Sequence, residues 1–579
     1  MSQKLSGAQI LVESLLKEKV EVVFGLPGGQ ALPIFDAIHG SKLNFILTRH
    51  EQAASHMADG YARSTGRVGV CIATSGPGAT NLVTGLATAH MDSVPMVAFT
   101  GQVSTSVIGQ DAFQEADITG ITRPITKHNF LVKDVKDLAR AIKEAFYIAS
   151  TGRPGPVLVD IPVDVQRAFT EFKYPDKASI RSYKPTFQGH TGQIKRAAEI
   201  INKSEKPVLY IGTGVVVSGA QDEIFEISQK AQIPVTNTLL AVGAYPFGAE
   251  LSLGMLGMHG AFCANRAMQA ADVIIAVGAR FDDRCTGKVC DFARSAKIIH
   301  IDIDPTSIAK IVETDLPVVG DAKAVLQELS PLIQNKKRTD WLKTIAAWKT
   351  EHSFNYNRDD GKLHPQHIIE TVSNLTKGEA IVATEVGQHQ MWAAQYYKAK
   401  YPRLFLSSGG LGTMGFGYPA GIGAKFGNPD KEVIVIAGDG SFQMNMQEMA
   451  VAVLNQVNVK VVIINNQYLG NVRQWQEMFY GKRYSHTCLA RRKNCPPLCN
   501  TPNRNSCPVY IPDFVKWAES YGVLGIRVTT KEEVEPAVKK MLEAKSSVVV
   551  DFWAEIEENI FPMVPAGASL DDIITRMDG

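Results

Sequence analysis

Short apolar runs alternate with amphipathic segments along most of the chain. Between residues 6 and 19, Ile10, Leu11 and Leu15 recur at helical spacing, and the β-branched run VEVVF and the turn LPGG follow. Similar runs are FILT, VGVCIAT, VPMVAFTG and GPVLVDIP. Strands that are apolar throughout and alternate with helices are typical of parallel sheets covered on both faces. The pattern predicts an α/β fold with doubly wound sheets.

Two further series of apolar runs follow the first. The second contains KPVLYIG, ADVIIAVG and AKIIHIDID, and the third contains EAIVATE, KEVIVIAG, VKVVIIN and SSVVVDF. A polar stretch with Pro and Lys at 167–190 and a charged, poorly periodic stretch at 336–365 separate the series. We therefore predict three domains, at 1–168, 190–335 and 365–579. The first and third share a strand, Gly-rich turn and helix layout, which favours two related domains around a different middle one.

Composition and charge narrow the class of protein. The 579 residues are 45% hydrophobic and 20% charged, as in ordinary globular proteins. A net charge of +2 argues against nucleic acid or an anionic membrane as a partner. The first twenty residues lack the apolar core of a signal peptide, and no stretch has the roughly 18 apolar residues of a membrane span. We expect a cytoplasmic protein without a membrane or nucleic-acid partner.

The strongest chemical motif has two parts. Gly438-Asp439-Gly440 directly follows the run KEVIVIA, and Asn465-Asn466 closes the next run, with 24 residues between the two parts. Successive parallel strands bring their carboxyl ends to one edge of the sheet, so Asp439 and Asn466 should lie close together. A carboxylate and an amide oxygen suit Mg²⁺ that also holds phosphate, and glycines let a diphosphate approach the backbone. Gly-Asp-Gly alone is also a common turn.

This spacing is similar to the diphosphate and metal signature of thiamine-diphosphate-dependent enzymes. The resemblance implies Mg²⁺ ligands from the side chains of Asp439 and Asn466 and from the main-chain carbonyl of Tyr468. It also implies an acid for the aminopyrimidine ring, and Glu51, which follows FILT, matches that position. Such a carboxylate favours the imino tautomer, whose nitrogen removes the proton from C2 of the thiazolium. In isolation, Glu51 would sooner be an ordinary first-turn glutamate favoured by the helix dipole, and only the paired metal motif favours the catalytic role.

Further segments resemble parts of the same cofactor site. TSGPGATN, at 74–81, is similar to the family's loop near the acid, and Gln114 matches a neighbouring catalytic position. GGLGTMGFGYPA, at 409–420, is similar to the segment whose bulky side chain bends the thiamine, and Met414 matches that side chain. Both stretches are otherwise explained as Gly-rich helix entries. The other implied cofactor contacts are Pro77, Asn81, Gly387, Gln388, His389, Gly412, Gly438, Gly440 and Ser441.

Two motifs resemble the acetolactate synthase branch of this family. VGARFDDR implies that Arg284 binds the carboxylate of the acceptor keto acid through its guanidinium fork. VRQWQ implies that Trp475 contacts the alkyl group of the acceptor. A salt-bridged surface arginine and a core tryptophan are the alternatives. Asn471, where many relatives have Met, leaves the fine shape of the acceptor pocket open.

The middle series resembles the FAD-binding domain of the same branch. No GxGxxG fingerprint is present, so FAD follows from the resemblance alone, with a structural and non-redox role. The implied FAD contacts are Gly212, Gly214, Thr238, Leu239, Leu256, Gly257, Met258, His259, Gly278, Arg280, Asp282, Asp302 and Asp321.

The resemblance extends from LPGG to the tail FPMVPAGASLDDII. It implies transfer of the hydroxyethyl unit of pyruvate, with loss of CO2, to pyruvate or 2-ketobutyrate. The products, 2-acetolactate and 2-aceto-2-hydroxybutyrate, lead to valine, leucine and isoleucine. The resemblance also implies a homodimer or homotetramer, with each active site formed from the first domain of one subunit and the third domain of another. A small regulatory subunit is a possible further partner.

Other activities fit the motifs less well. Pyruvate oxidases and simple decarboxylases lack the joint pattern of VGARFDDR and VRQWQ. Glyoxylate carboligase has an apolar residue where this chain has Glu51. A non-catalytic homologue acting as a scaffold would be expected to have lost Glu51 or Asp439, and both are present.

Four of the eight cysteines, Cys488, Cys495, Cys499 and Cys507, fall within twenty residues. Similar sequences pass directly from a KRYSHT-like to a PDF-like segment, so about twenty positions here resemble an insertion. The spacings of six, three and seven residues differ from the paired CxxC pattern of a zinc ribbon. Four thiolates can hold Zn²⁺ or an iron–sulfur cluster, and unpaired thiols or two disulfides are the alternatives. We predict a bound metal.

Overall fold

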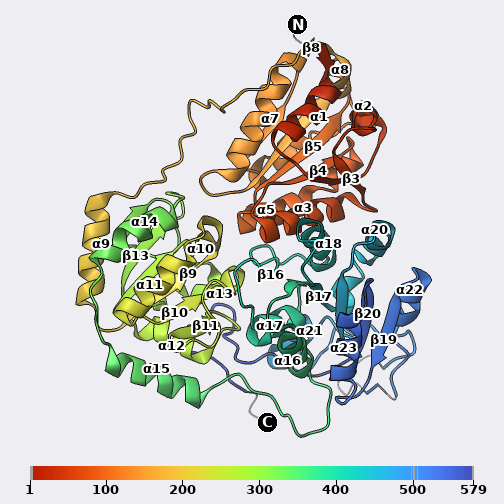
Figure 1. The fold of residues 1–579 in the computed structure, drawn as a ribbon. Coiled ribbons are helices and arrows are strands. Elements are labelled where there is room, and N and C mark those ends of the chain that lie inside the picture. Colours follow the sequence, from red (N-terminus) through yellow and green to blue (C-terminus); the bar gives the residue numbers. More distant parts are fainter. Residues whose placement is uncertain (1–3, 497–498, 500–502, 505, 577–579) are drawn as a thin grey trace.

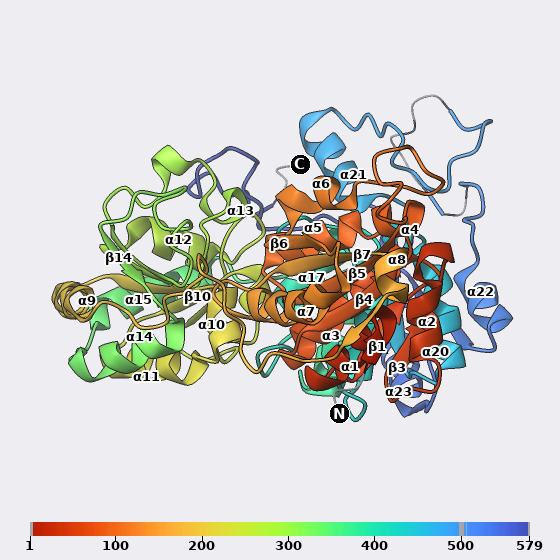
Figure 2. The same cartoon turned by 90° about the horizontal axis from the view of Figure 1, so that it is seen from above.

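The structure is a computed structural model that describes residues 4–496, 499, 503–504 and 506–576. It contains three six-stranded parallel sheets, which confirms the predicted fold class. The amino-terminal sheet lies at the top of Figure 1, and the other two lie side by side below it. Seen from above, the amino-terminal part covers the carboxyl-terminal part, and the middle part stands to one side (Figure 2).

The first sheet is packed between two groups of helices. Its strands, in spatial order, are β3 (Asn44–Leu47), β2 (Val22–Gly25), β4 (Gly69–Ala73), β5 (Met96–Gln102), β7 (Pro156–Pro162) and β6 (His128–Leu131). The helices are α1 (Gly7–Lys17), α2 (Leu32–Ile38), α3 (Glu51–Thr65), α4 (Pro77–Thr80), α5 (Val83–Asp92), α6 (Ile118–Thr122), α7 (Val135–Ser150) and α8 (Val163–Arg167). A short antiparallel pair joins β1 (Lys4–Ser6) to β8 (Phe169–Glu171).

The second sheet has a different strand order. Its strands are β11 (Ser252–Met255), β10 (Val235–Asn237), β9 (Pro207–Ile211), β12 (Val273–Val277), β13 (Lys297–Asp302) and β14 (Leu316–Val319). The helices are α9 (Thr191–Lys203), α10 (Thr213–Ser218), α11 (Gln221–Ala231), α12 (Phe262–Ala270), α13 (Asp283–Thr286), α14 (Ala322–Leu329) and α15 (Thr339–Glu351).

The third sheet repeats the order of the first. Its strands are β16 (Phe405–Leu406), β15 (Ile381–Thr384), β17 (Val433–Gly438), β18 (Lys460–Asn465), β20 (Val548–Trp553) and β19 (Leu524–Val528). The helices are α16 (Pro365–Thr376), α17 (Gln388–Tyr396), α18 (Gly417–Gly427), α19 (Asp439–Phe442), α20 (Met449–Leu454), α21 (Gly470–Phe479), α22 (Phe514–Ser520) and α23 (Val534–Glu543).

Strand order separates the middle sheet from its two neighbours. Numbered by their place in each series, the strands of the first and third sheets run 2-1-3-4-6-5, whereas those of the middle sheet run 3-2-1-4-5-6. The second order is that of dinucleotide-binding folds. The structure thus agrees with the prediction of two related domains around a different middle one. The order first reverses between β2 and β4, between β9 and β12, and between β15 and β17, and ligands of such folds bind at the strand ends beside such a reversal.

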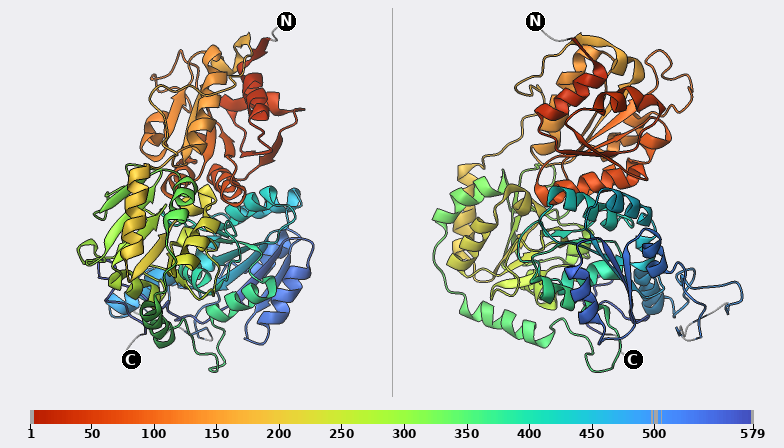
Figure 3. Two further views of the ribbon diagram at one scale, coloured as in Figure 1. Left: turned by 60° about the vertical axis from the view of Figure 1, so that its left-hand side comes forward. Right: turned by 45° about the vertical axis from the view of Figure 1, so that its right-hand side comes forward.

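Helices α3 and α18 bring the first and third sheets together (Figure 3). A Cβ atom at Gly60 would lie 2.1 Å from the Ala420 carbonyl oxygen, and one at Gly423 would lie 1.9 Å from that of Met57. The two backbones therefore touch, and only glycine permits this approach. Apolar residues of α3 and of the third sheet belong to one continuous core. The third domain therefore holds α3, whose first residue is Glu51.

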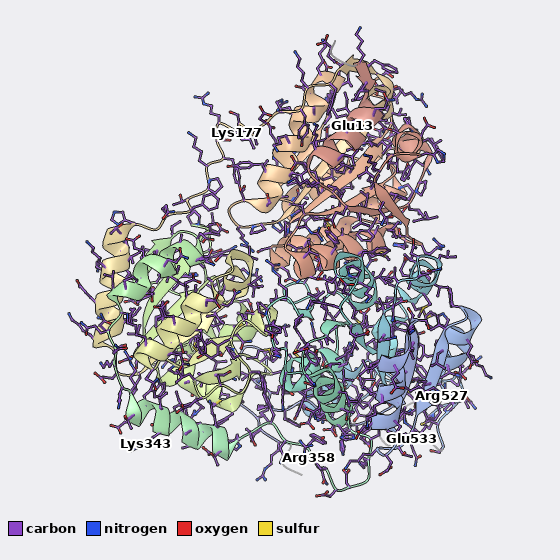
Figure 4. All side chains as sticks on the ribbon, in the orientation of Figure 1. Glu13, Lys177, Lys343, Arg358, Arg527 and Glu533 are labelled. Carbon is purple, nitrogen blue, oxygen red and sulfur yellow. The ribbon has the colours of Figure 1, made fainter. Side chains whose placement is uncertain are left out.

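The two connections between the sheets differ. Lys177 and Lys343 mark them in Figure 4. The first connection is largely extended, whereas the second, poorly periodic in sequence, contains helix α15. Trp341 and Ile345 are buried on one face of α15, next to α12, and the surrounding lysines and acidic residues conceal that pattern. Within the described part of the chain, every helix is too short or too polar to cross a bilayer.

Candidate functional site

A cavity of about 230 Å³ lies where the order of the third sheet reverses, at the carboxyl ends of β15 and β17. It brings together residues that are far apart in the sequence. The predicted residues that line it are Gly387, Gln388, His389, Gly412, Met414, Gly438, Asp439, Gly440, Ser441, Asn466 and Tyr468. Every cofactor and metal residue predicted in the third domain therefore borders one space.

The side chains in this cavity suit a hard cation. Asp439 is 1% exposed, burial raises the pKa of its carboxyl group to about 7, and its Oδ2 atom has no hydrogen-bond partner. The amide of Asn466 accepts from the Tyr468 N–H and donates to Gln388 Oε1, both at 3.1 Å. A buried carboxylate with an unpartnered oxygen is costly unless something positive binds it. The residues present therefore fit Mg²⁺ as the ion held there.

Close packing explains the glycines around the cavity. A Cβ atom at Gly438 would lie 2.6 Å from His389 Nδ1, and one at Gly470 would lie 2.1 Å from Gln388 Oε1. His389 is fully buried, its Nε2 has no partner, and burial lowers the pKa of its ring to about 3. The unpartnered ring nitrogen of His389 and the main chain of Gly438 and Gly470, which no side chain covers, are available to a polar ligand such as a diphosphate.

Glu51 belongs to a second group of predicted residues, at the end of the first sheet. The Asn81 amide donates to Glu51 Oε2 at 3.0 Å, and a Cβ atom at Gly78 would lie 3.2 Å from Glu51 Oε1. Gln114, at φ +60°, has its carbonyl oxygen 2.7 Å from the Cβ position of Gly76. Glu51, Pro77, Asn81 and Gln114 border neither the cavity at Asp439 nor the larger one described next. Neither of these two cavities therefore unites the two halves of the predicted site.

A larger cavity, of about 590 Å³, lies at the carboxyl ends of β9 and β12. Its volume is in the range of small-molecule and cofactor sites. The predicted FAD residues that line it are Gly212, Gly214, Thr238, Leu239, Leu256, Met258, His259, Gly278, Arg280, Asp282, Asp302 and Asp321. Gly257 does not line it. Its N–H and carbonyl are hydrogen-bonded to the Asn265 amide at 2.9 and 3.0 Å.

The walls of the larger cavity come from all three domains. Arg153 reaches it from the first domain and forms an ion pair with Asp304 at 3.2 Å, and the 408–412 loop reaches it from the third. The Cβ position of Gly212 lies 2.1 Å from the Gly278 carbonyl oxygen, so the turns after β9 and β12 touch without any GxGxxG sequence. Arg153 and most of the 408–412 loop carry no sequence signal for this cavity, because no local pattern shows that these segments meet.

Trp475 stands where the two cavities adjoin. Together with Val386, Gly412 and Asn471, it borders both of them. Trp475 is only partly buried, which argues against a purely structural core tryptophan. Arg284 lines the larger cavity, its side chain is 55% exposed, and its ion pair with Asp283 is long, at 3.8 Å. An exposed contact of that length contributes little, so Arg284 is available to a carboxylate ligand.

The structure gives no support to the predicted metal site at the four cysteines. Among the residues described, no three His, Cys, Asp or Glu side chains are arranged to hold a metal ion. All four thiols are free of disulfides. Backbone N–H groups of Arg492 and Asn503 donate to the sulfurs of Cys495 and Cys507, at 3.3 and 3.4 Å. These sulfurs thus have local partners within the segment.

Comparison with known proteins gives one consistent result. Three models of thiamine pyrophosphate enzymes match: the N-terminal TPP binding domain at residues 5–121, the central domain at 194–329 and the C-terminal TPP binding domain at 385–552. The acetolactate synthase large subunit of Haemophilus influenzae is 46% identical over 99% of this chain and 98% of its own. The isozyme 3 large subunit of Escherichia coli is 45% identical over 99% and 98%. The Corynebacterium glutamicum large subunit is 48% identical over 99% and 90%.

Proposed function

From the premise that this chain belongs to the acetolactate synthase large subunits, a family of thiamine-pyrophosphate enzymes, we propose that it joins two 2-keto acids with loss of CO2. Pyruvate supplies the two-carbon unit. Pyruvate as acceptor gives 2-acetolactate, and 2-ketobutyrate gives 2-aceto-2-hydroxybutyrate, the precursors of the branched-chain amino acids. The observation that carries the proposal is the junction of the two cavities at Trp475, with Arg284 on one side and Asp439 on the other.

Thiamine diphosphate, when bound, supplies a carbon nucleophile and an electron sink for decarboxylation. We assign Asp439, Asn466 and the Tyr468 carbonyl as the residues that would hold Mg²⁺. Gly387, Gln388, His389, Gly438, Gly440 and Ser441 would bind the diphosphate, and Met414 would pack against the thiamine. The unpartnered oxygen of Asp439 and the free nitrogen of His389 support these assignments.

Glu51 would hold or release a proton toward the aminopyrimidine ring. Its carboxyl group is 6% exposed and is oriented by the Asn81 amide, so water competes little for that proton. Pro77 and Gln114 would close the same side of the ring. Arg284 would bind the acceptor carboxylate, and Trp475 would limit the space for its alkyl group.

The larger cavity would bind FAD in a structural role, because the proposed reaction has no net oxidation. The dinucleotide-type strand order of the middle sheet and the volume of about 590 Å³ support this assignment. Asp302 at the end of β13 is buried, which raises the pKa of its carboxyl group to about 6. A hydroxyl group of the ligand is a suitable partner for such a carboxyl group.

A second copy of the chain would complete each active site. Because Asp439 lines a cavity that Glu51 of the same chain does not border, we propose a homodimer or homotetramer that pairs the first domain of one subunit with the third domain of another. The relatives are named large subunits, which implies a smaller partner subunit. A regulatory role for that partner and a cytoplasmic location are parts of the same proposal.

The direct test is to incubate the purified protein with pyruvate, thiamine diphosphate and Mg²⁺. We expect acetolactate and CO2 without net oxidation, and the E51Q variant should fold but lose most of this activity. Acetaldehyde as the main product would indicate a decarboxylase. Consumption of oxygen with release of acetate would indicate an oxidase, and either result would contradict the proposal.

A further inference from the structure

The cysteine-bearing segment, defined as the described residues 488–496, 499, 503–504 and 506–510, contacts the edge of the third sheet that carries the proposed Mg²⁺ ligands. Its first residue, Cys488, pairs with Tyr468 in an antiparallel bridge. The Leu489 N–H donates to the Gln467 carbonyl, and the Leu469 N–H donates to the Thr487 carbonyl, both at 2.9 Å. The segment and the preceding Thr487 are thus hydrogen-bonded to the backbone on both sides of Tyr468.

Arg504 makes a second contact with this edge. Its guanidinium donates to the carbonyl oxygens of Asn465 and Ala554, both at 2.6 Å. Asn465 ends β18 and directly precedes Asn466, and Ala554 follows the end of β20. The guanidinium also lies over the Trp553 ring, 5.3 Å from its centroid. The Arg504 guanidinium is partly buried and is hydrogen-bonded to the ends of two neighbouring strands. These charge-assisted hydrogen bonds restrict the turn that carries Asn466.

Tyr510 makes a third link to this edge, through Gln443 to Asp439. Tyr510 is 6% exposed, and its hydroxyl oxygen accepts a hydrogen bond from the Gln443 amide at 3.0 Å. The same amide donates to the main-chain carbonyl of Asp439 at 3.0 Å, and the nearby Asp439 carboxyl group adds to the effect of burial in raising the pKa of Tyr510. Oδ2 of Asp439 remains without a partner. A carboxylate that is oriented by a neighbour and still has an open oxygen is prepared for a cation.

We propose that Tyr510 and Arg504 are positioning residues of the Mg²⁺–diphosphate site. Tyr510 orients the carboxylate of Asp439, and Arg504 restricts the movement of the strand ends beside Asn466 through its two hydrogen bonds. This inference rests on the proposed function, because it requires Asp439 and Asn466 to be the metal ligands. Partners that orient metal ligands usually change metal affinity by about 10- to 100-fold when removed.

The experiment measures cofactor binding without turnover. Thiamine diphosphate is titrated calorimetrically into the purified full-length protein at a series of Mg²⁺ concentrations, with no keto acid present. In Y510F and R504Q, the Mg²⁺ concentration that gives half-maximal cofactor binding should rise about tenfold or more. Y510F keeps the ring that packs against Phe514, so it decides the question if R504Q does not fold.

Two matched controls lie in the same domain. Lys460 begins β18, and its ammonium group donates to the Ala544 and Ser546 carbonyls at the opposite end of the strand from Arg504. Tyr397 donates to the Ala380 carbonyl at 2.8 Å. K460Q and Y397F should leave the Mg²⁺ requirement unchanged. If these controls raise it as much as Y510F and R504Q do, general loosening explains the effect and the inference fails.

A further variant, D439N, distinguishes the positioning role of Tyr510 and Arg504 from the metal-ligand role of Asp439. D439N should abolish Mg²⁺-dependent binding of thiamine diphosphate. If D439N does so while Y510F and R504Q bind like the wild type, the positioning role is wrong and the metal assignment stands. If D439N itself leaves the Mg²⁺ requirement unchanged, the metal assignment fails, and this inference fails with it.

Discussion

The separation of Glu51 from Asp439 leads to a quantitative prediction about mixed oligomers. In one chain, Glu51 lies in the group with Asn81 and Gln114, whereas Asp439 lines the cavity at the end of β17. If each active site pairs these groups across two subunits, a hybrid of E51Q and D439N subunits contains two kinds of site. One site carries both substitutions, and the other carries neither. The hybrid therefore has one intact site of two, although both parent proteins are inactive.

The expected magnitude follows from random assortment. Equal amounts of the two variants give hybrids in about half of the dimers, and each hybrid has half of its sites intact, so activity should return to about a quarter of the wild-type value. Co-expression with two different affinity tags and purification over both columns isolates the hybrid, which should show about half of the wild-type activity. Acetolactate formation from pyruvate is the assay. A doubly tagged hybrid no more active than the parents would refute the shared site.

Three further predictions follow from individual contacts. Replacing Trp475 with Leu should lower the preference for 2-ketobutyrate over pyruvate by about 1 to 3 kcal/mol, because one methylene group in a pocket usually contributes that much. The measurement is the product ratio in a mixed-acceptor assay. An unchanged ratio would show that Trp475 does not contact the acceptor. A hydrogen bond to Glu558 raises the pKa of His364, so its contribution to stability is fully present below the ordinary value of about 6.5 and is lost as pH rises through the raised value. H364Q should flatten this part of the dependence of Tm on pH, and identical profiles would contradict the assignment. Replacing Gly60 with Ala puts a Cβ atom 2.1 Å from the Ala420 carbonyl oxygen. Such overpacking should lower the free energy of unfolding, measured by urea titration, by about 1 to 3 kcal/mol. An unchanged free energy of unfolding would mean that α3 and α18 move apart to make room for the methyl group.

Much of the fold and of the two cavities could be predicted from the sequence. The inner strands of parallel sheets are buried on both faces, so runs such as KEVIVIA and VKVVII identify β17 and β18 without other information. Because consecutive parallel strands usually lie side by side with their carboxyl ends at one edge of the sheet, Asp439 is expected beside Asn466. In the structure both residues line one cavity. Short or outer strands such as β16 and β19 were not identified, because a strand at the edge of a sheet needs no continuous apolar run.

Tertiary structure alone decided which distant segments meet. Periodicity and motifs report the burial and chemistry of one element at a time, whereas a cavity wall or a ligand's neighbour depends on how separate elements pack. For that reason Tyr510 and Arg504, in a segment without helical or strand periodicity, gave no sign that they are linked to Asp439 through Gln443 and to the end of β18. The contact of α3 with α18 was equally hidden, since Gly60 and Gly423 lie far apart in the sequence and matter only where two backbones touch.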